Sequence, residues 1–299
     1  MNFTSFEQVI TTARAKGVSK ISVANAGDTD IIESIKNACE EKIVEPILVG
    51  DQDKIEEIAA QVQFDLKQAE IIHEIDAAKA ALTAVEQVSS GKADILMKGS
   101  VNSSAFMKAV LDKNVGLRKG NLLSHLAALD ISEYGRILYV TDGGINIAPE
   151  LEQKIEIMEN AIEFMHKLGY PEPKVALLSA NEVVIPKMKS TEEAALISKM
   201  ADRKQIKNAV VDGPLSLDLA ISLKSVAMKG VESRVAGQAQ LLVAPNIETG
   251  NVLCKSVVYF ANAQIAGVVL GATAPIVMTS RADTSKAKLA SIALASLGR

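Results

Sequence analysis

The stretch SKISVANAGDTDIIESIKNACEEKIVEPILVG (residues 19–50) sets the fold class of this chain. Its two ends, 19–25 and 44–50, are short apolar segments rich in Ile and Val that close on a polar residue or glycine, which is typical of buried β-strands. The segment between them carries one apolar stripe at helical spacing. The stripe consists of Ile31, Ile32, Ile35 and Ala38. Strand, helix and strand in this order predict a crossover in a parallel sheet with helices on both faces.

The same alternation continues along the chain and predicts two α/β lobes. A long amphipathic helix, LEQKIEIMENAIEFMHKLG, separates two of the later strands and ends at Gly169 in the manner of a C-terminal glycine cap. The other predicted strands are 69–74, 93–99, 136–141, 173–180, 208–213, 239–246 and 266–271. We find no repeat or low-complexity linker, so the lobes are expected to pack together.

The composition is that of a globular chain without the features of a nucleic-acid or membrane protein. Hydrophobic residues make up 48% of the 299 residues, and no apolar run approaches the roughly 18 residues of a membrane span. The net charge is −4, basic residues are scattered, and aromatic residues are only 3%, so a basic patch and a stacking platform for bases are both missing. The N-terminus lacks a signal-peptide pattern. We therefore expect a cytoplasmic protein that binds neither nucleic acid nor membrane.

Polar residues that follow predicted strands are the candidate ligand contacts, because open parallel sheets bind ligands beyond the carboxyl ends of their strands. In MTSRAD (278–283), Arg281 offers a planar fork to phosphate oxygens, and Thr279 and Ser280 add hydroxyls. A predicted helix follows, and its first N–H groups favour the same anion. The alternative is structural: Thr279 or Ser280 caps this helix, and Asp283 complements its dipole.

Three further segments place polar residues after predicted strands. Their candidate contacts are Lys98, Ser103 and Arg118 in and after MKGSVNSSAF (97–106), Asp212 in VVDGPLSLDLA (210–220), and Asn246 in VAPNIETGN (243–251). Each also has an ordinary explanation as a turn or first-turn residue. Neither G-x-x-x-x-G-K-[ST] nor G-x-G-x-x-G occurs in the sequence. The motifs that usually identify a nucleoside triphosphatase or a Rossmann dehydrogenase are therefore missing. No His, Cys or carboxylate cluster has metal-ligand spacing.

His125 and Cys254 are the remaining candidates for chemistry. His125, in LLSHLAAL, is the histidine nearest to a candidate site, but no G-x-S-x-G elbow supports a Ser-His-Asp triad. The two cysteines, Cys39 and Cys254, lie far apart and are predicted to be reduced structural thiols, with a nucleophilic Cys254 as the alternative.

Five segments, taken in order, carry a family likeness. They are KGSVNSSAFMKAVLDKNVGLR, NLLSHLAAL, DGPLSLDLA, LLVAPNIETGNVLCK and GATAPIVMTSRADTSKAKLAS. As a set they resemble the phosphate acetyl/butyryltransferase family, although no single segment is specific. The chain is most similar to the butyryltransferase branch, because it is short, has no extra regulatory domain and carries SRADT after its last strand.

The resemblance implies reversible transfer of a short acyl group, butyryl first among them, from coenzyme A to inorganic phosphate in a ternary complex. It also implies the two-domain α/β fold of the isocitrate and isopropylmalate dehydrogenases, with parallel or mixed sheets and an interdomain cleft. In that fold the last strand and helix return to the first domain, so the expected domains are residues 1–134 with 275–299, and residues 135–274. A homodimer or larger homo-oligomer is expected, with coenzyme A as a substrate and no tightly bound cofactor or metal.

The resemblance also assigns roles. The Ser-Arg pair matching Ser280 and Arg281 belongs to the family's active site, where Arg281 would hold phosphate and Ser280 would donate to the developing oxyanion or departing thiolate. Some acetyltransferase members carry a proposed basic aspartate seven residues after that serine, where this chain has Ala287. Asp283 is the alternative base, and a dianionic phosphate that needs no base is another. Ser103 stands where many butyryltransferase-like sequences have threonine, which keeps the hydroxyl.

Two rival classes remain. One is another enzyme on the same fold: a phosphate acetyltransferase, an enzyme that uses acyl carrier protein, or a hydroxy-acid dehydrogenase with a metal-binding aspartate cluster. The other is a non-catalytic acyl-coenzyme A sensor, which would bind the thioester without releasing thiol in response to phosphate.

Overall fold

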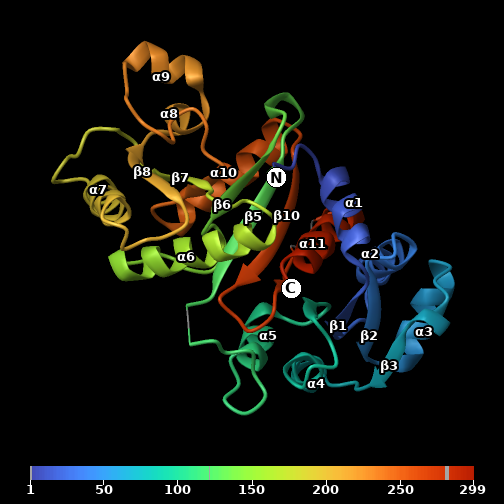
Figure 1. Ribbon diagram of the computed structural model, residues 1–299. Helices are drawn as coiled ribbons and strands as arrows, with labels where there is room; N and C mark the ends of the chain where they lie inside the picture. The colour runs from blue at the N-terminus through green and yellow to red at the C-terminus, as the bar shows by residue number, and fades with distance from the viewer. Residues whose placement is uncertain (1, 121, 280–282) are drawn as a thin grey trace. The chain divides into compact units, whose positions relative to one another are not determined.

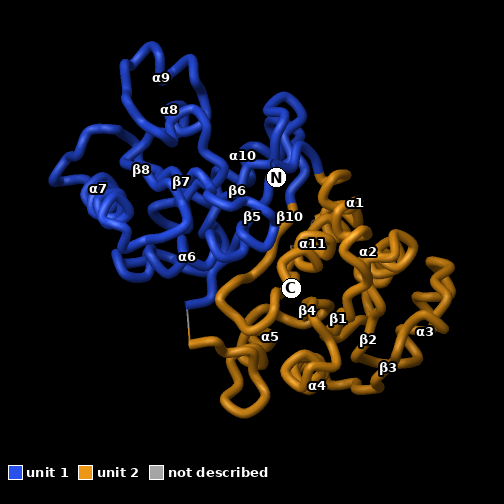
Figure 2. Tube along the Cα trace, viewed as in Figure 1, with its two compact units in different colours: residues 1–5, 122–265 blue, residues 6–121, 266–299 orange. Residues whose placement is uncertain are grey.

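The chain forms two compact units (Figures 1 and 2). The structure is a computed structural model that describes residues 2–120, 122–279 and 283–299. Unit 1 comprises residues 1–5 and 122–265, and unit 2 comprises residues 6–121 and 266–299. The domain boundaries predicted from sequence, and the cleft between domains, stay predictions.

Unit 2 contains the stretch that sets the fold class. The predicted apolar stripe of its first crossover helix is buried, as expected. Asp28 caps that helix by accepting a hydrogen bond from the Ile31 N–H group at 3.3 Å. The elements of unit 2 are α1 (Phe6–Lys16), β1 (Ser19–Ala24), α2 (Thr29–Glu40), β2 (Val44–Gly50), α3 (Gln52–Gln61), η1 (Leu66–Gln68), β3 (Glu70–His73), α4 (Ala77–Ser89), β4 (Ile95–Lys98), α5 (Ser103–Val110), β10 (Gln264–Leu270, whose first two residues belong to unit 1), β11 (Ile276–Val277) and α11 (Ser285–Leu297).

The strands of unit 2 follow the order β3-β2-β1-β4-β11-β10. Neighbours are parallel except β10 and β11, which are antiparallel. The chain moves outward from β1 to β3 through α2 and α3, and α4 then returns it to β4. Because such crossovers are right-handed, α2 and α4 cover opposite faces, and α11 packs on α2 while α5 packs on α4. The connections after β1 and β4 therefore leave the sheet toward opposite faces.

Unit 1 also alternates strands with helices around a mixed sheet. Its long predicted helix ends as expected, with Gly169 in the left-handed region at φ 89°. The elements are β5 (Ser124–Asp130), η2 (Ser132–Tyr134), β6 (Ile137–Thr141), α6 (Leu151–Lys167), β7 (Lys174–Leu178), α7 (Lys189–Asp202), β8 (Val210–Leu215), α8 (Leu217–Ile221), α9 (Leu223–Lys229), β9 (Leu241–Val243) and α10 (Ile247–Phe260).

The strands of unit 1 follow the order β5-β6-β9-β7-β8. Neighbours are parallel except β5 and β6. The chain moves outward through α6 and α7 and returns through α8 and α9, so α7 and α10 leave the adjacent strands β7 and β9 toward opposite faces. Mixed sheets in both units confirm the predicted α/β fold class.

Three features differ from the sequence predictions. β5 was not predicted, and β11, the strand expected before SRADT, is only two residues long. The strand predicted over residues 208–213 is β8, which continues through Pro214 to Leu215. Among the described residues, none of the helices is both long and apolar enough to cross a membrane.

Candidate functional site

The carboxyl ends of β1 and β4 form the first candidate site, in unit 2. These strands pair Ala24 with Lys98, and the chain beyond them is tied together by backbone bonds. The Gly99 N–H donates to the Ala24 carbonyl at 2.9 Å, and the Ser100 N–H donates to the Asn25 carbonyl at 2.8 Å. A Cβ atom at Gly99 would lie 2.5 Å from the Asn25 carbonyl oxygen, so only glycine fits. Lys98 is thus held at a point where connections diverge, which is where open sheets bind ligands.

Other predicted contacts lie along this edge. β11 is the parallel neighbour of β4 and pairs Val277 with Met97, so Thr279 follows its strand end close to that of Lys98. Ser103 is the first residue of α5 and is exposed, while Asn102 caps that helix through the Ala105 N–H at 2.7 Å. Arg118 is exposed and forms an antiparallel bridge with Ala272. The structure therefore places Lys98 and Thr279 at the carboxyl ends of the neighbouring strands β4 and β11. Ser103 follows Lys98 by five residues.

The start of the last helix differs from the sequence prediction. Thr284 caps α11, and its hydroxyl accepts from the Ala287 N–H at 3.2 Å. The expectation that Thr279 or Ser280 caps this helix is therefore wrong, because the helix begins only at Ser285. Ser280 and Arg281, the predicted catalytic pair, lie outside the described residues.

Lys288 is a residue that the sequence reasoning missed. It is only 2% exposed, and its ammonium donates to the Asp283 carbonyl at 2.6 Å and lies 3.5 Å from the Asp30 carboxylate. A buried ammonium needs such partners. It ties the predicted Asp283 to the second turn of α11. A lysine as the one charged residue in the stretch AKLASIALASL was the available signal.

Asp142 organises the second candidate site, in unit 1, at the carboxyl end of β6. The residue is 3% exposed, and its carboxylate accepts hydrogen bonds from the backbone N–H groups of His125, Gly144, Ile145 and Asn146 and from the Asn146 side chain, at 2.7–3.3 Å. These bonds fix the loop of residues 142–146. One of these bonds also fixes the backbone of His125, a predicted substrate contact that lies in β5. Sequence reasoning missed Asp142, although an acid followed by two glycines after a strand was visible.

Two glycines hold the start of α10 against this loop. A Cβ atom at Gly250 would lie 2.6 Å from the Asp142 carbonyl oxygen, and one at Gly143 would lie 2.8 Å from the Gly250 carbonyl carbon. The Asn251 side-chain amide donates to the Gly143 carbonyl at 3.1 Å. The close approach of two backbones therefore requires glycine on both sides.

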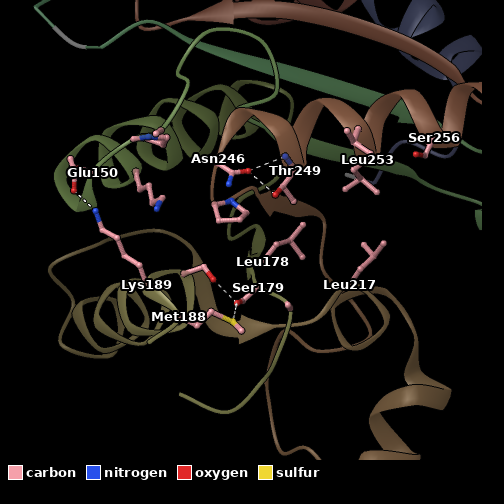
Figure 3. Close-up of a pocket in the computed structure, with 17 residues that line it drawn as sticks. Glu150, Leu178, Ser179, Met188, Lys189, Leu217, Asn246, Thr249, Leu253 and Ser256 are labelled. Atoms are coloured by element: carbon pink, nitrogen blue, oxygen red, sulfur yellow. Dashed lines mark hydrogen bonds and ion pairs between the residues drawn. The ribbon is translucent and has the colours of Figure 1, made fainter. Parts of the chain in front are cut away.

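A cavity of about 870 Å³ lies beside this loop, at the carboxyl ends of β7 and β9 (Figure 3). Ser179 follows β7, and Asn246 follows β9 and caps α10. The Asn246 Oδ1 atom accepts from the N–H and hydroxyl groups of Thr249, at 2.9 and 2.7 Å. The cavity is also lined by Ala148, Pro149, Glu150, Lys154, Leu178, Ala180, Met188, Lys189, Ser190, Leu217, Pro245, Val252, Leu253 and Ser256.

The charged residues that line this cavity are all paired. Lys189 contacts Glu150 and lies 3.5 Å from Glu193, and Lys154 contacts Glu193 in a buried pair. The contact between Glu150 and Lys189 lowers the pKa of the carboxyl and raises that of the ammonium. Among the described residues that line it, the cavity therefore has hydrogen-bonding groups and apolar walls but no unpaired charge.

Asp212 lies apart from this cavity. It is in the middle of β8, where its carboxylate accepts from the Ser233 hydroxyl and from the Gly213 N–H, the latter at 2.8 Å. It lines a different cavity. Within residues 2–120, 122–279 and 283–299, no three His, Cys, Asp or Glu side chains are grouped closely enough to hold a metal ion.

Cys254 is 7% exposed and packs in the unit 1 core, as predicted for a structural thiol. Burial raises the pKa of its thiol to about 12, against a smaller lowering by Lys255, and burial likewise raises the pKa of Cys39 to about 12. Because the thiolate is the reactive form, Cys254 is a poor nucleophile near neutral pH.

These raised values predict a loss of stability in alkali. Above about pH 9 the unfolded chain loses thiol protons that the folded chain keeps, so the free energy of unfolding falls as pH rises toward 12. Each such thiol contributes a slope of at most about 1.4 kcal/mol per pH unit. We expect Cys254→Ala to flatten this slope, measured by urea unfolding at pH 8 and pH 10. If the free energy of unfolding depended on pH equally in Cys254→Ala and in the wild type, the raised pKa of the Cys254 thiol would be contradicted.

The fold places this chain among the open α/β proteins, a class in which ligands generally bind where diverging connections leave the carboxyl ends of the strands. Within this class the model of the family described as "Phosphate acetyl/butaryl transferase" matches residues 67–296. The chain belongs to this family.

Known proteins agree with this assignment. The chain is 46% identical to the phosphate butyryltransferase of Clostridium acetobutylicum over 293 residues, 98% of this chain and 97% of that one. A crystal structure of a branched-chain phosphotransacylase from Enterococcus faecalis superposes with a TM-score of 0.83 at 34% identity, covering 93% of this chain and 99% of that one. The 4-hydroxythreonine-4-phosphate dehydrogenase of Klebsiella pneumoniae, at 15% identity, 93% and 98% coverage and a TM-score of 0.58, shares the fold alone.

Proposed function

We propose that this chain is a phosphate acyltransferase that moves a short acyl group, butyryl first among them, between coenzyme A and inorganic phosphate. The observation that supports this most directly is the 46% identity to a phosphate butyryltransferase over nearly the whole chain. Acetyl transfer is the second candidate, because the family description names both acyl groups.

The proposed reaction is one displacement. A phosphate oxygen attacks the thioester carbonyl carbon, the C–S bond breaks as the C–O bond forms, and the thiolate of coenzyme A leaves and takes up the proton that hydrogen phosphate releases. Arg281 is proposed to hold the phosphate, and Ser280 to donate to the oxyanion or the thiolate. Lys98, Ser103, Arg118 and Thr279 are proposed substrate contacts in unit 2, with His125, Asp212 and Asn246 in unit 1. Asp283 is the proposed base, if the phosphate needs one.

Release of free thiol from acetyl-, butyryl- and isobutyryl-coenzyme A, with and without phosphate, tests the proposal. We expect thiol release to require phosphate and to be fastest with butyryl-coenzyme A. Binding of the thioester without phosphate-dependent release would favour a sensor instead. Because the displacement needs no acyl-enzyme, Cys254→Ala should retain turnover.

A homodimer or larger homo-oligomer remains part of the proposal. Tyr259 and Phe260, at the end of α10, are 73% and 91% exposed, and Val252 is also exposed. Exposed large apolar side chains grouped on one helix are typical of protein interfaces. Sedimentation velocity measures the assembly directly, and a monomer at micromolar concentration would contradict it.

A further inference from the structure

We propose that the cavity of unit 1 binds the acyl-pantetheine arm of the thioester, with Leu178, Leu217 and Leu253 around the acyl chain. This inference rests on the proposed function and deepens it. It assigns these three leucines as determinants of acyl chain length. It also assigns Asn246 and Ser179 as partners of the pantetheine amides.

The position of the cavity supports a ligand site. In unit 1 the chain leaves β7 and β9 toward opposite faces; Ser179 is the first residue after β7, and Asn246 is the third residue after β9. Divergence of neighbouring connections opens a crevice at the carboxyl end of a sheet, which is where ligands bind in open α/β folds. A volume of about 870 Å³ lies in the usual range for small-molecule sites, roughly 300–1,000 Å³.

The charges of the cavity select the uncharged part of the substrate. Glu150, Lys154 and Lys189 are each engaged in an ion pair, so none of these side chains is available to bind the phosphates of coenzyme A, and the attacking phosphate is held by Arg281 instead. An acyl-pantetheine chain carries no charge and would leave these ion pairs intact. The phosphates of coenzyme A are therefore expected outside this cavity.

The walls of the cavity differ from end to end (Figure 3). Leu178, Leu217 and Leu253 gather at one end, and the Glu150–Lys189 pair marks the other. Such a gradient suits a chain with polar amides that ends in a short alkyl group. Burying each methylene of that group strengthens binding about fourfold, so the leucine end can distinguish acyl lengths.

Hydrogen-bonding groups lie between the two ends. The cap of α10 uses only the Oδ1 atom of Asn246, and Nδ2 faces the cavity, where it can donate to an amide carbonyl (Figure 3). The hydroxyls of Ser179 and Ser190 lie 2.8 Å apart and can accept from an amide N–H. These are the partners that the two amides of pantetheine require.

Substrate-length profiles test this inference. We expect Leu253→Ala to raise kcat/KM for hexanoyl-coenzyme A relative to butyryl-coenzyme A about tenfold, because the shorter side chain makes room for the longer acyl group. Leu217→Phe should lower kcat/KM for butyryl- relative to acetyl-coenzyme A by a similar factor. Leu223→Ala, on α9 and 61% exposed outside the cavity, is the matched control and should change neither ratio. Unchanged ratios in both cavity variants would overturn the inference.

A measurement on the unaltered chain covers the case in which a variant fails to fold. Hydrogen–deuterium exchange should show protection of residues 179–190 and 247–253 by butyryl-coenzyme A and by butyryl-pantetheine, but not by adenosine 3′,5′-bisphosphate. Phosphate-dependent thiol release without this protection would refute the cavity assignment alone. Protection by butyryl-pantetheine without any thiol release would refute the proposed function and leave the cavity assignment standing.

Discussion

Replacing Arg281 by Lys is expected to lower kcat/KM for phosphate by about a hundredfold, the scale of losing one well-placed donor to the transition state. A guanidinium can grip two phosphate oxygens with parallel hydrogen bonds, whereas an ammonium is a point charge on a flexible stem. The loss should appear in kcat as well as in KM, because the second bond also orients the attacking oxygen.

Arg203→Lys is the matched control for this change. Arg203 is exposed at the end of α7, and its replacement should leave both constants within a factor of two. Initial rates over a phosphate series at saturating butyryl-coenzyme A give the two constants. Near-normal turnover in Arg281→Lys would remove Arg281 from the phosphate site and with it the proposed assignment of the SRADT segment.

Most of the sheet could be predicted from local pattern alone. Segments such as 44–50 and 136–141 are apolar, β-branched and bounded by polar residues or glycine, and the structure has strands there. β5 was missed because SHLAALD mixes strand and helix formers and lacks both a strict alternation and a helical stripe. A strand was expected before SRADT, but the short length of β11 could not be predicted, because a two-residue strand is defined by its neighbours β4 and β10, which only the tertiary structure supplies.

The candidate site was predicted less completely than the strands, because several of its residues are defined by tertiary contacts. Lys98 ends β4, and Thr279 and Asn246 come two and three residues after β11 and β9, so the rule that ligands bind at carboxyl ends finds them. Asp142 and Lys288 are important for what they contact: loop amides in one case, the Asp283 carbonyl in the other. Such contacts depend on how the chain folds back on itself. The cavity beside Asn246 combines residues from five elements or their ends, a combination that no local spacing encodes.

Asp142→Ala is expected to give the largest loss of stability, lowering the free energy of unfolding by about 3 kcal/mol or more. The substitution leaves several N–H donors of the 142–146 loop buried without an acceptor, and each unsatisfied group costs about 1–3 kcal/mol unless water reaches it. Urea unfolding measures the change. Asp202→Ala removes an exposed carboxylate paired with Lys199 at 3.1 Å and should cost less than about 1 kcal/mol.

The same variant should also weaken thioester binding where the protein remains folded. The loop that Asp142 holds is in backbone contact with Gly250, and Gly250 lies in the first turn of α10, beside Thr249 on the cavity wall. Loosening the loop releases that turn, so KM for butyryl-coenzyme A should rise more than KM for phosphate. Asp142→Asn keeps one acceptor oxygen and should fall between the wild type and Asp142→Ala in both measurements. A loss below about 1 kcal/mol in Asp142→Ala would mean that water replaces the carboxylate and that the loop is not held by it.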